Sequence, residues 1–135
     1  MRQIALAPTA RPPVEFHGEL MVAVDGQDPD DQTGGRCHDI AIYHVENGDL
    51  AVVIAYRTTA AGESEHCTVE MAQNADDVDE ILSLYDPKSM VVLTDDSSQR
   101  RLAEHVVRHY DLAVNDVLSR LQEIASSDST PSQPR

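Results

Sequence analysis

Apolar and polar residues alternate along much of the first half of the chain, which is the pattern of half-buried β-strands. Four such runs are bounded by Gly, Pro, Asn and Asp residues, which favour turns. The strands are predicted over residues 14–24, 37–45, 50–58 and 65–72, and residues 89–93 are the candidate for a fifth strand. In the first run Gly18 is a candidate β-bulge. The alternation there puts five apolar side chains on one face: Val14, Phe16, Leu20, Val22 and Val24.

The dipeptide Asn47-Gly48 lies between the second and third predicted strands, and Asn-Gly favours a two-residue type I′ turn. With that turn, His38 pairs with Arg57 on the neighbouring strand. We expect an even-length loop after the third strand, and such a loop pairs Arg57 with His66. The three side chains then point from the same face of the sheet, because directly paired residues share a face.

This register also decides which apolar side chains share a face. One face collects Tyr43, Val52, Ile54, Tyr56, Cys67, Val69 and Met71. An odd-length loop would instead put Thr68 and Glu70 on that face. The opposite face carries Ile40, Ile42, Ala51, Val53 and Ala55. That face is more apolar than a solvated antiparallel face should be, so we expect it to be covered by the fifth strand, the N-terminal arm or a second copy of the chain.

Two later segments, residues 75–85 and 97–125, repeat their apolar residues at helical spacing. Asn74 is expected to cap the first helix, and Pro87 ends it. The second segment alternates spacings of four and three residues between apolar positions. A helix of ~28 residues spans ~42 Å, which is longer than a domain of this size is wide. The helix therefore either breaks near residues 109–111, or its end projects and pairs with another subunit.

These elements predict an α+β fold, in which an antiparallel meander of four to five strands is followed by two helices packed on one face. The length of 135 residues suits one domain, which we place at residues 14–125. Residues 1–13 contain three prolines and are expected to form a flexible arm. Residues 126–135 are of low complexity and are expected to form a disordered tail.

The net charge of the chain limits the classes of function that we expect. The chain has 24 Asp and Glu against 10 Lys and Arg, for a formal net charge of −14. Direct nucleic-acid binding is not expected, because neutralising phosphates needs a basic surface. No apolar run approaches the ~20 residues of a membrane span, and the N-terminus lacks the apolar region of a secretory signal, so we expect a cytoplasmic protein. A single Lys and an excess of Asp fit either a high-salt cytoplasm or GC-rich coding.

The sequence contains no motif from which we predict catalytic residues, a metal site or a cofactor. Cys37-His38 and His66-Cys67 form a mirror-image pair, but the cysteines do not have zinc spacing. The expected register also puts the permanent charge of Arg57 between the two histidines, and this charge opposes a metal. His38, Arg57 and His66 instead form a candidate row for a small carboxylate or phosphate, which the forked guanidinium can grip.

Three functions follow as hypotheses. The leading one is a small acidic, non-catalytic interaction or accessory protein that forms a dimer through the apolar sheet face or the C-terminal helix. Its candidate interface residues are Ile40, Ile42, Val53, Val114 and Leu121. The second is a small anionic-ligand-binding domain or enzyme that uses the row of His38, Arg57 and His66. The third is an acidic inhibitor that binds a basic, DNA-binding partner by imitating DNA, although acids at helix N-termini are expected there anyway.

Overall fold

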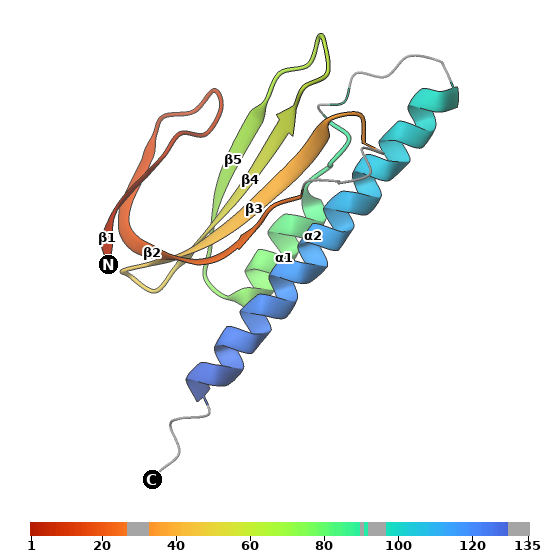
Figure 1. Cartoon of the computed structure of the whole chain (residues 1–135). Helices are drawn as coiled ribbons and strands as arrows, with labels where there is room; N and C mark the ends of the chain where they lie inside the picture. The colour runs from red at the N-terminus through yellow and green to blue at the C-terminus, as the bar shows by residue number, and fades with distance from the viewer. Residues whose placement is uncertain (27–32, 90, 92–96, 130–135) are drawn as a thin grey trace.

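A computed structural model describes residues 1–26, 33–89, 91 and 97–129, with the side chains of 97–99 and 125–129 left undescribed (Figure 1). One five-stranded antiparallel sheet, in the order β1-β2-β3-β4-β5, precedes two helices. The elements are β1 (Arg2–Leu6), β2 (Val14–Val24), β3 (Arg36–Val45), β4 (Leu50–Thr58), β5 (His66–Ala72), α1 (Ala75–Leu84) and α2 (Ser97–Ser129). The predicted α+β fold is therefore confirmed.

The fifth strand of the sheet is formed by N-terminal residues, which were expected to form a flexible arm. Residues Arg2–Leu6 form β1 and pair with β2 from Arg2–Gly18 to Leu6–Val14. This part of the expected flexible arm is thus an ordered edge strand, and its one buried side chain, Ile4, gives a weak sequence signal. Most of the alternative strand, residues 89–93, lies outside the described residues.

The β3–β4 turn differs from the predicted type I′ turn by one residue. Its loop has three residues, Glu46 to Gly48, and Val45 N–H donates to the Asp49 carbonyl (2.9 Å). A type I′ turn needs positive φ at both central residues, but of Asn47 and Gly48 only Gly48 has it (98°). His38 is therefore paired with Tyr56, and Cys37 with Arg57. A shift of one residue exchanges the two faces of a strand.

The β4–β5 pairing is shifted in the same way, since Tyr56 is opposite His66 and Ala55 is opposite Cys67. This pairing requires an odd-length loop, so the prediction of an even-length loop is wrong. The face toward the helices holds the main core, which includes Val22, Val24, Ile40, Ile42, Val52 and Ile54. The predicted apolar outer face with Ile40 and Ile42 does not exist, because those two side chains are 1% and 0% exposed beneath the helices.

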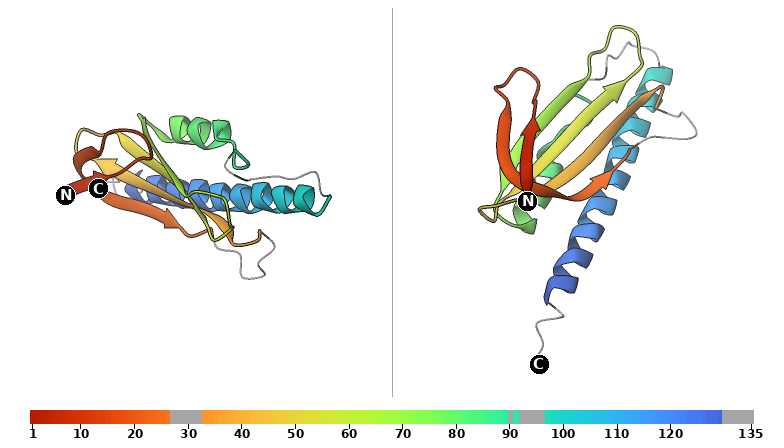
Figure 2. Two further views of the ribbon diagram at one scale, coloured as in Figure 1. Left: turned by 90° about the horizontal axis from the view of Figure 1, so that it is seen from above. Right: turned by 60° about the vertical axis from the view of Figure 1, so that its left-hand side comes forward.

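A β-bulge between Leu20 and Val22 changes which side chains of β2 point to each face of the sheet. Leu20 pairs with Tyr43 on the outer face, whereas Val22 pairs with Ile42 on the helix face. The prediction that Leu20 and Val22 share a face is therefore wrong. The extra residue bends the strand, as bulges do, and β1 with the first half of β2 folds over the sheet on the side away from α2 (Figure 2).

The β1–β2 hairpin is fastened to the far edge of the sheet. Thr9 N–H donates to the Cys67 carbonyl (2.9 Å), and Cys67 N–H donates to Thr9 Oγ1 (2.9 Å). Arg11 lies 3.5 Å from the Glu70 carboxylate. Ala51 and Val69, which point to this side, are buried. N-terminal residues thus cover part of the second sheet face, which is not the face with Ile40 and Ile42 for which a cover was expected.

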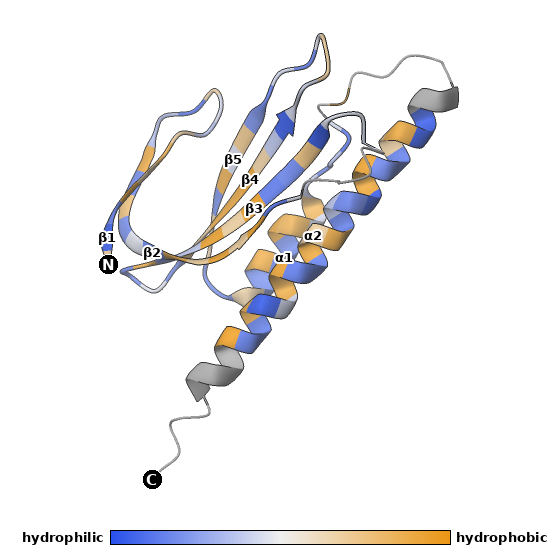
Figure 3. Ribbon diagram, in the orientation of Figure 1, coloured by the Kyte–Doolittle hydropathy of each residue, from blue (hydrophilic) through white to orange (hydrophobic). Residues whose placement is uncertain are grey.

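Both helices pack on the other face, with α2 over β2 and β3 and α1 over β4 and β5 (Figure 1). Asn74 caps α1 as predicted, and its side chain accepts from Asp77 N–H (2.9 Å). Tyr110 Oη donates to the Leu82 carbonyl (2.6 Å) and so joins the two helices. Figure 3 shows that hydrophobic residues recur along α2.

α2 is one unbroken helix of 33 residues, which spans ~50 Å at ~1.5 Å per residue. Its C-terminal end extends past the sheet, as the unbroken alternative required (Figure 1). It continues through Ser129, four residues beyond the predicted end, and the rest of the expected tail lies outside the described residues. In the described part of the chain, neither helix has the apolar length that a bilayer crossing requires.

Candidate functional site

A cavity of about 330 Å³ opens on the sheet face that the helices leave uncovered. The β1–β2 hairpin covers the other end of this face, near Tyr43, with which Phe16 makes an edge-to-face ring contact. The cavity is lined by Ala23, Val24, Asp25, Asp39, Ile40, Ala41, Val53, Ala55 and Arg57. Its floor is apolar and made largely of small side chains from three neighbouring strands, so the strands themselves leave room there.

The charged residues gather at one end of the cavity. Arg57 forms an ion pair with Asp39 (Nε to Oδ2, 2.8 Å), and Arg57 Nη2 lies 3.8 Å from Asp25 Oδ1. Gly26 N–H donates to the other oxygen of Asp39 (3.2 Å). Burial raises the pKa of Asp39, and the Gly26 hydrogen bond and the Arg57 charge oppose that rise. The Arg57 side chain remains 45% exposed, so the guanidinium is held in place and accessible at once.

Gly26 is needed for this arrangement because the backbone there runs close to β3. A Cβ at position 26 would lie 2.0 Å from the His38 carbonyl oxygen. Only a glycine allows that approach, and the approach brings the Gly26 amide to Asp39.

Cys37 completes the cluster, since it is paired directly with Arg57. Asp25, Cys37 and Asp39 each have one ligand atom within 4.8 Å of those of the other two. Among the described residues, these three form the group whose spacing could suit a metal ion. A metal would need the thiolate, but burial raises the pKa of Cys37, and the opposing effect of Arg57 is smaller. The fixed charge of Arg57 beside the group also opposes a cation of high charge.

The predicted row of His38, Arg57 and His66 is not formed. Arg57 lies on the outer face, whereas His38 is 3% exposed on the helix face, and the partly buried His66 lies opposite Tyr56. The rings of Tyr56, Tyr85 and Tyr110 have centroids 5.0, 5.4 and 5.1 Å from that of His38. This burial lowers the pKa of His38 to about 4, and its Nε2 has no hydrogen-bond partner among the described residues.

The residues predicted to form an interface are also placed differently. Ile40, Ile42 and Leu121 are buried in the main core, and Val114 is partly buried against it. Val53 is partly buried and lines the cavity. The predicted sheet surface for a second copy is therefore absent. A dimer formed in another way, and a basic protein partner, stay predictions.

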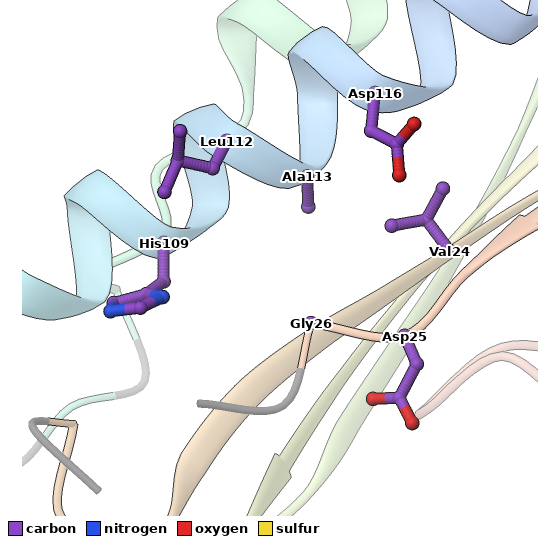
Figure 4. Close-up of a pocket in the computed structure, with 7 residues that line it drawn as sticks. All are labelled: Val24, Asp25, Gly26, His109, Leu112, Ala113 and Asp116. Carbon is purple, nitrogen blue, oxygen red and sulfur yellow. The ribbon is translucent and has the colours of Figure 1, made fainter. Parts of the chain in front are cut away.

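A second cavity of about 230 Å³ lies between α2 and the end of β2 (Figure 4). His109, Leu112, Ala113 and Asp116 line it from α2. The Asp116 carboxylate accepts from Arg120 Nε (3.1 Å), and Arg120 also donates to the Ala23 carbonyl (3.2 Å), so this acid helps to anchor the helix. Figure 4 shows the Asp25 carboxylate pointing away from α2. Asp25 therefore belongs with Asp39 and Arg57 in the larger cavity.

Sequence reasoning identified Arg57 but missed the acids beside it, Asp25 and Asp39, and the thiol of Cys37. The signal that could have found them is the turn at Glu46–Gly48, because a three-residue loop pairs Cys37 with Arg57. Asn-Gly occurs in both two-residue and three-residue hairpin loops, so the dipeptide alone does not select between them.

Comparison with protein-family models, with curated proteins and with solved structures finds no match to this chain. A proposal for what the protein binds therefore rests on the residues that line the larger cavity.

Proposed function

We propose that the protein is a small-molecule-binding domain whose ligand occupies the cavity on the outer face of the sheet, against Arg57 and Asp39. The observation that carries this proposal is the composition of the cavity lining. A largely apolar floor with a few charged groups converging at one end is the usual make-up of a ligand site, and its volume of about 330 Å³ is within the usual range.

The two parts of the cavity have different tasks in this proposal. The floor of Ala41, Val53 and Ala55 stabilises an apolar body by removing it from water, at about 25 cal/mol per Å². The charged end orients the ligand. Asp39 holds the Arg57 guanidinium through Nε, which reduces the entropy that ligand binding must remove from a long side chain.

Binding without nucleophilic catalysis fits the chemistry beside the cavity. A cysteine nucleophile acts as the thiolate, usually with a histidine as its base. Burial raises the pKa of Cys37, and none of the lining residues is a histidine. In the described residues, the cavity thus offers recognition groups rather than an activated nucleophile.

The test is to fill the cavity and to measure ligand binding. A library of small polar organic molecules is screened by thermal shift, and each hit is measured again with Ala55→Phe and Arg57→Ala. The bulky ring at position 55 removes the space, and Arg57→Ala removes the charged anchor, so both variants should lose the shift. Ala61→Phe is the matched control, because Ala61 is exposed in the β4–β5 loop. Hits that bind both variants unchanged, or a library without hits, would refute the proposal.

A further inference from the structure

Resting on the proposed function, we infer that the ligand is a small zwitterion of the α-amino-acid type, whose ammonium lies against Asp39 and Asp25, whose carboxylate lies against Arg57, and whose aliphatic side chain lies on the alanine-rich floor. The feature behind this inference is a guanidinium and two carboxylates side by side at one end of an otherwise apolar cavity.

Each charge of the site disfavours a ligand that carries only charge of the same sign. A simple anion that approaches Arg57 meets the carboxylates of Asp39 and Asp25, and like charges brought together are costly. A simple cation that approaches the carboxylates meets the permanent charge of Arg57. A ligand with adjacent opposite charges satisfies both groups, which is how complementary potentials give specificity.

The hydrogen-bonding capacity of the cluster suits both ends of such a ligand. The acceptor atoms of Asp25, Cys37 and Asp39 lie within 4.8 Å of one another. An ammonium group has three N–H donors and can therefore contact all three side chains at once. A guanidinium has five N–H donors. Arg57 is ion-paired with Asp39 through Nε and interacts with the Cys37 side chain, while Nη2 is too far from Asp25 for a hydrogen bond. Donors therefore remain for a ligand carboxylate.

The burial of the carboxylates supports an ammonium partner. The Asp39 side chain is 32% exposed, and burial raises the pKa of its carboxyl group. A carboxylate that has lost part of its hydration is stabilised by an additional positive charge nearby. The chain itself offers few such charges, because it carries only 10 basic residues against 24 acidic ones.

The test compares three compounds with the same branched aliphatic body: valine, isobutylamine and 3-methylbutanoate. Calorimetric titration of the full chain should give valine an affinity at least about tenfold higher than that of either relative, since each relative lacks one ionic contact. Equal or tighter binding of the amine or of the acid would overturn the inference. If none of the three binds while other compounds from the screen do, this inference fails and the proposed function survives.

Variants assign the two contacts separately. Arg57→Gln should weaken valine about tenfold and leave isobutylamine unchanged or tighter, whereas Asp39→Asn should weaken valine and leave 3-methylbutanoate unchanged or tighter. Asp116→Asn, in the second cavity, is the matched control and should not change the affinity for valine. The melting temperature of each variant without ligand shows whether it is folded. A loss of valine affinity with Asp116→Asn and none with Asp39→Asn would place the ligand elsewhere and overturn the inference.

Discussion

The protonation state of His38 couples the stability of the fold to pH. It is 3% exposed between three tyrosine rings, and burial lowers its pKa from 6.5 to about 4. Between those two values the unfolded chain holds a proton on His38 that the folded chain does not. The free energy of unfolding therefore falls as the pH falls through this window, by about 3 kcal/mol in total.

Urea denaturation of the wild type and of His38→Phe checks this at about pH 7.5 and about pH 5. The contribution of His38 lost between these values should be about 2 kcal/mol, so the variant should show a correspondingly smaller pH dependence. Tyr85, directly after α1, and Tyr110, on α2, are ring neighbours of His38. Burial raises their pKa values further above neutrality, so they do not titrate in this window. An identical pH dependence in both proteins would contradict the prediction.

Glu63 is a second buried charge, and here the charge is paired. Its side chain is 0% exposed and accepts from Arg36 Nε (2.9 Å), Tyr56 Oη (2.6 Å) and Thr58 Oγ1 (3.2 Å). Glu63→Gln leaves the Arg36 guanidinium without its counter-charge and should cost about 3–5 kcal/mol of unfolding free energy in urea denaturation. Glu65→Gln, exposed in the same loop, should change it by less than about 0.5 kcal/mol. Similar values for the two variants would argue against the buried pair.

At the scale of single elements, β2 is the strand on which the shape of the sheet depends. Its bulge moves alternate side chains from the outer face, before the bulge, to the helix face after it, and Gly18 lies where β2 pairs with both β1 and β3. A Cβ at Gly18 would lie 2.4 Å from the His44 carbonyl oxygen, a backbone atom that cannot move alone.

Gly18→Ala should therefore destabilise the protein by about 2 kcal/mol or more, measured by thermal or urea unfolding. Glu19→Ala, one residue further along the same strand and exposed, is the matched control and should have an effect within about 0.5 kcal/mol. If Gly18→Ala were as mild as the control, the close approach of β2 to β3 would not hold in solution.

The elements themselves were largely predictable, because their apolar spacing is local. Strands β2 to β5, α1 and most of α2 follow from periods of two and of 3.6 residues. The faces were not predictable, since one residue in the loop at Glu46–Gly48 inverts them, and both faces of β3 and β4 are apolar enough to accept either register. The bulge near Met21 was also hidden, because alternation continues on either side of it. Arg57 was recognised as a site residue for its chemistry, but its neighbours depend on the register.

At the scale of the whole molecule, the sheet is covered unequally on its two faces. Two helices bury one face, and the β1–β2 hairpin, fastened through Thr9 to β5, covers part of the other. The remaining part of that face is the cavity with Arg57 and Asp39. The site is thus a consequence of the short N-terminal hairpin.

The most direct test of this account is an amide proton–nitrogen correlation spectrum of the full chain, recorded by NMR with and without valine. We expect the valine-induced shifts to concentrate at the larger cavity, on Asp39, Ala41, Ala55 and Arg57. We expect none on the α2 residues of the second cavity, His109 to Asp116. Shifts confined to α2, or a spectrum that valine leaves unchanged at millimolar concentration, would contradict the assignment of this cavity as an amino-acid site.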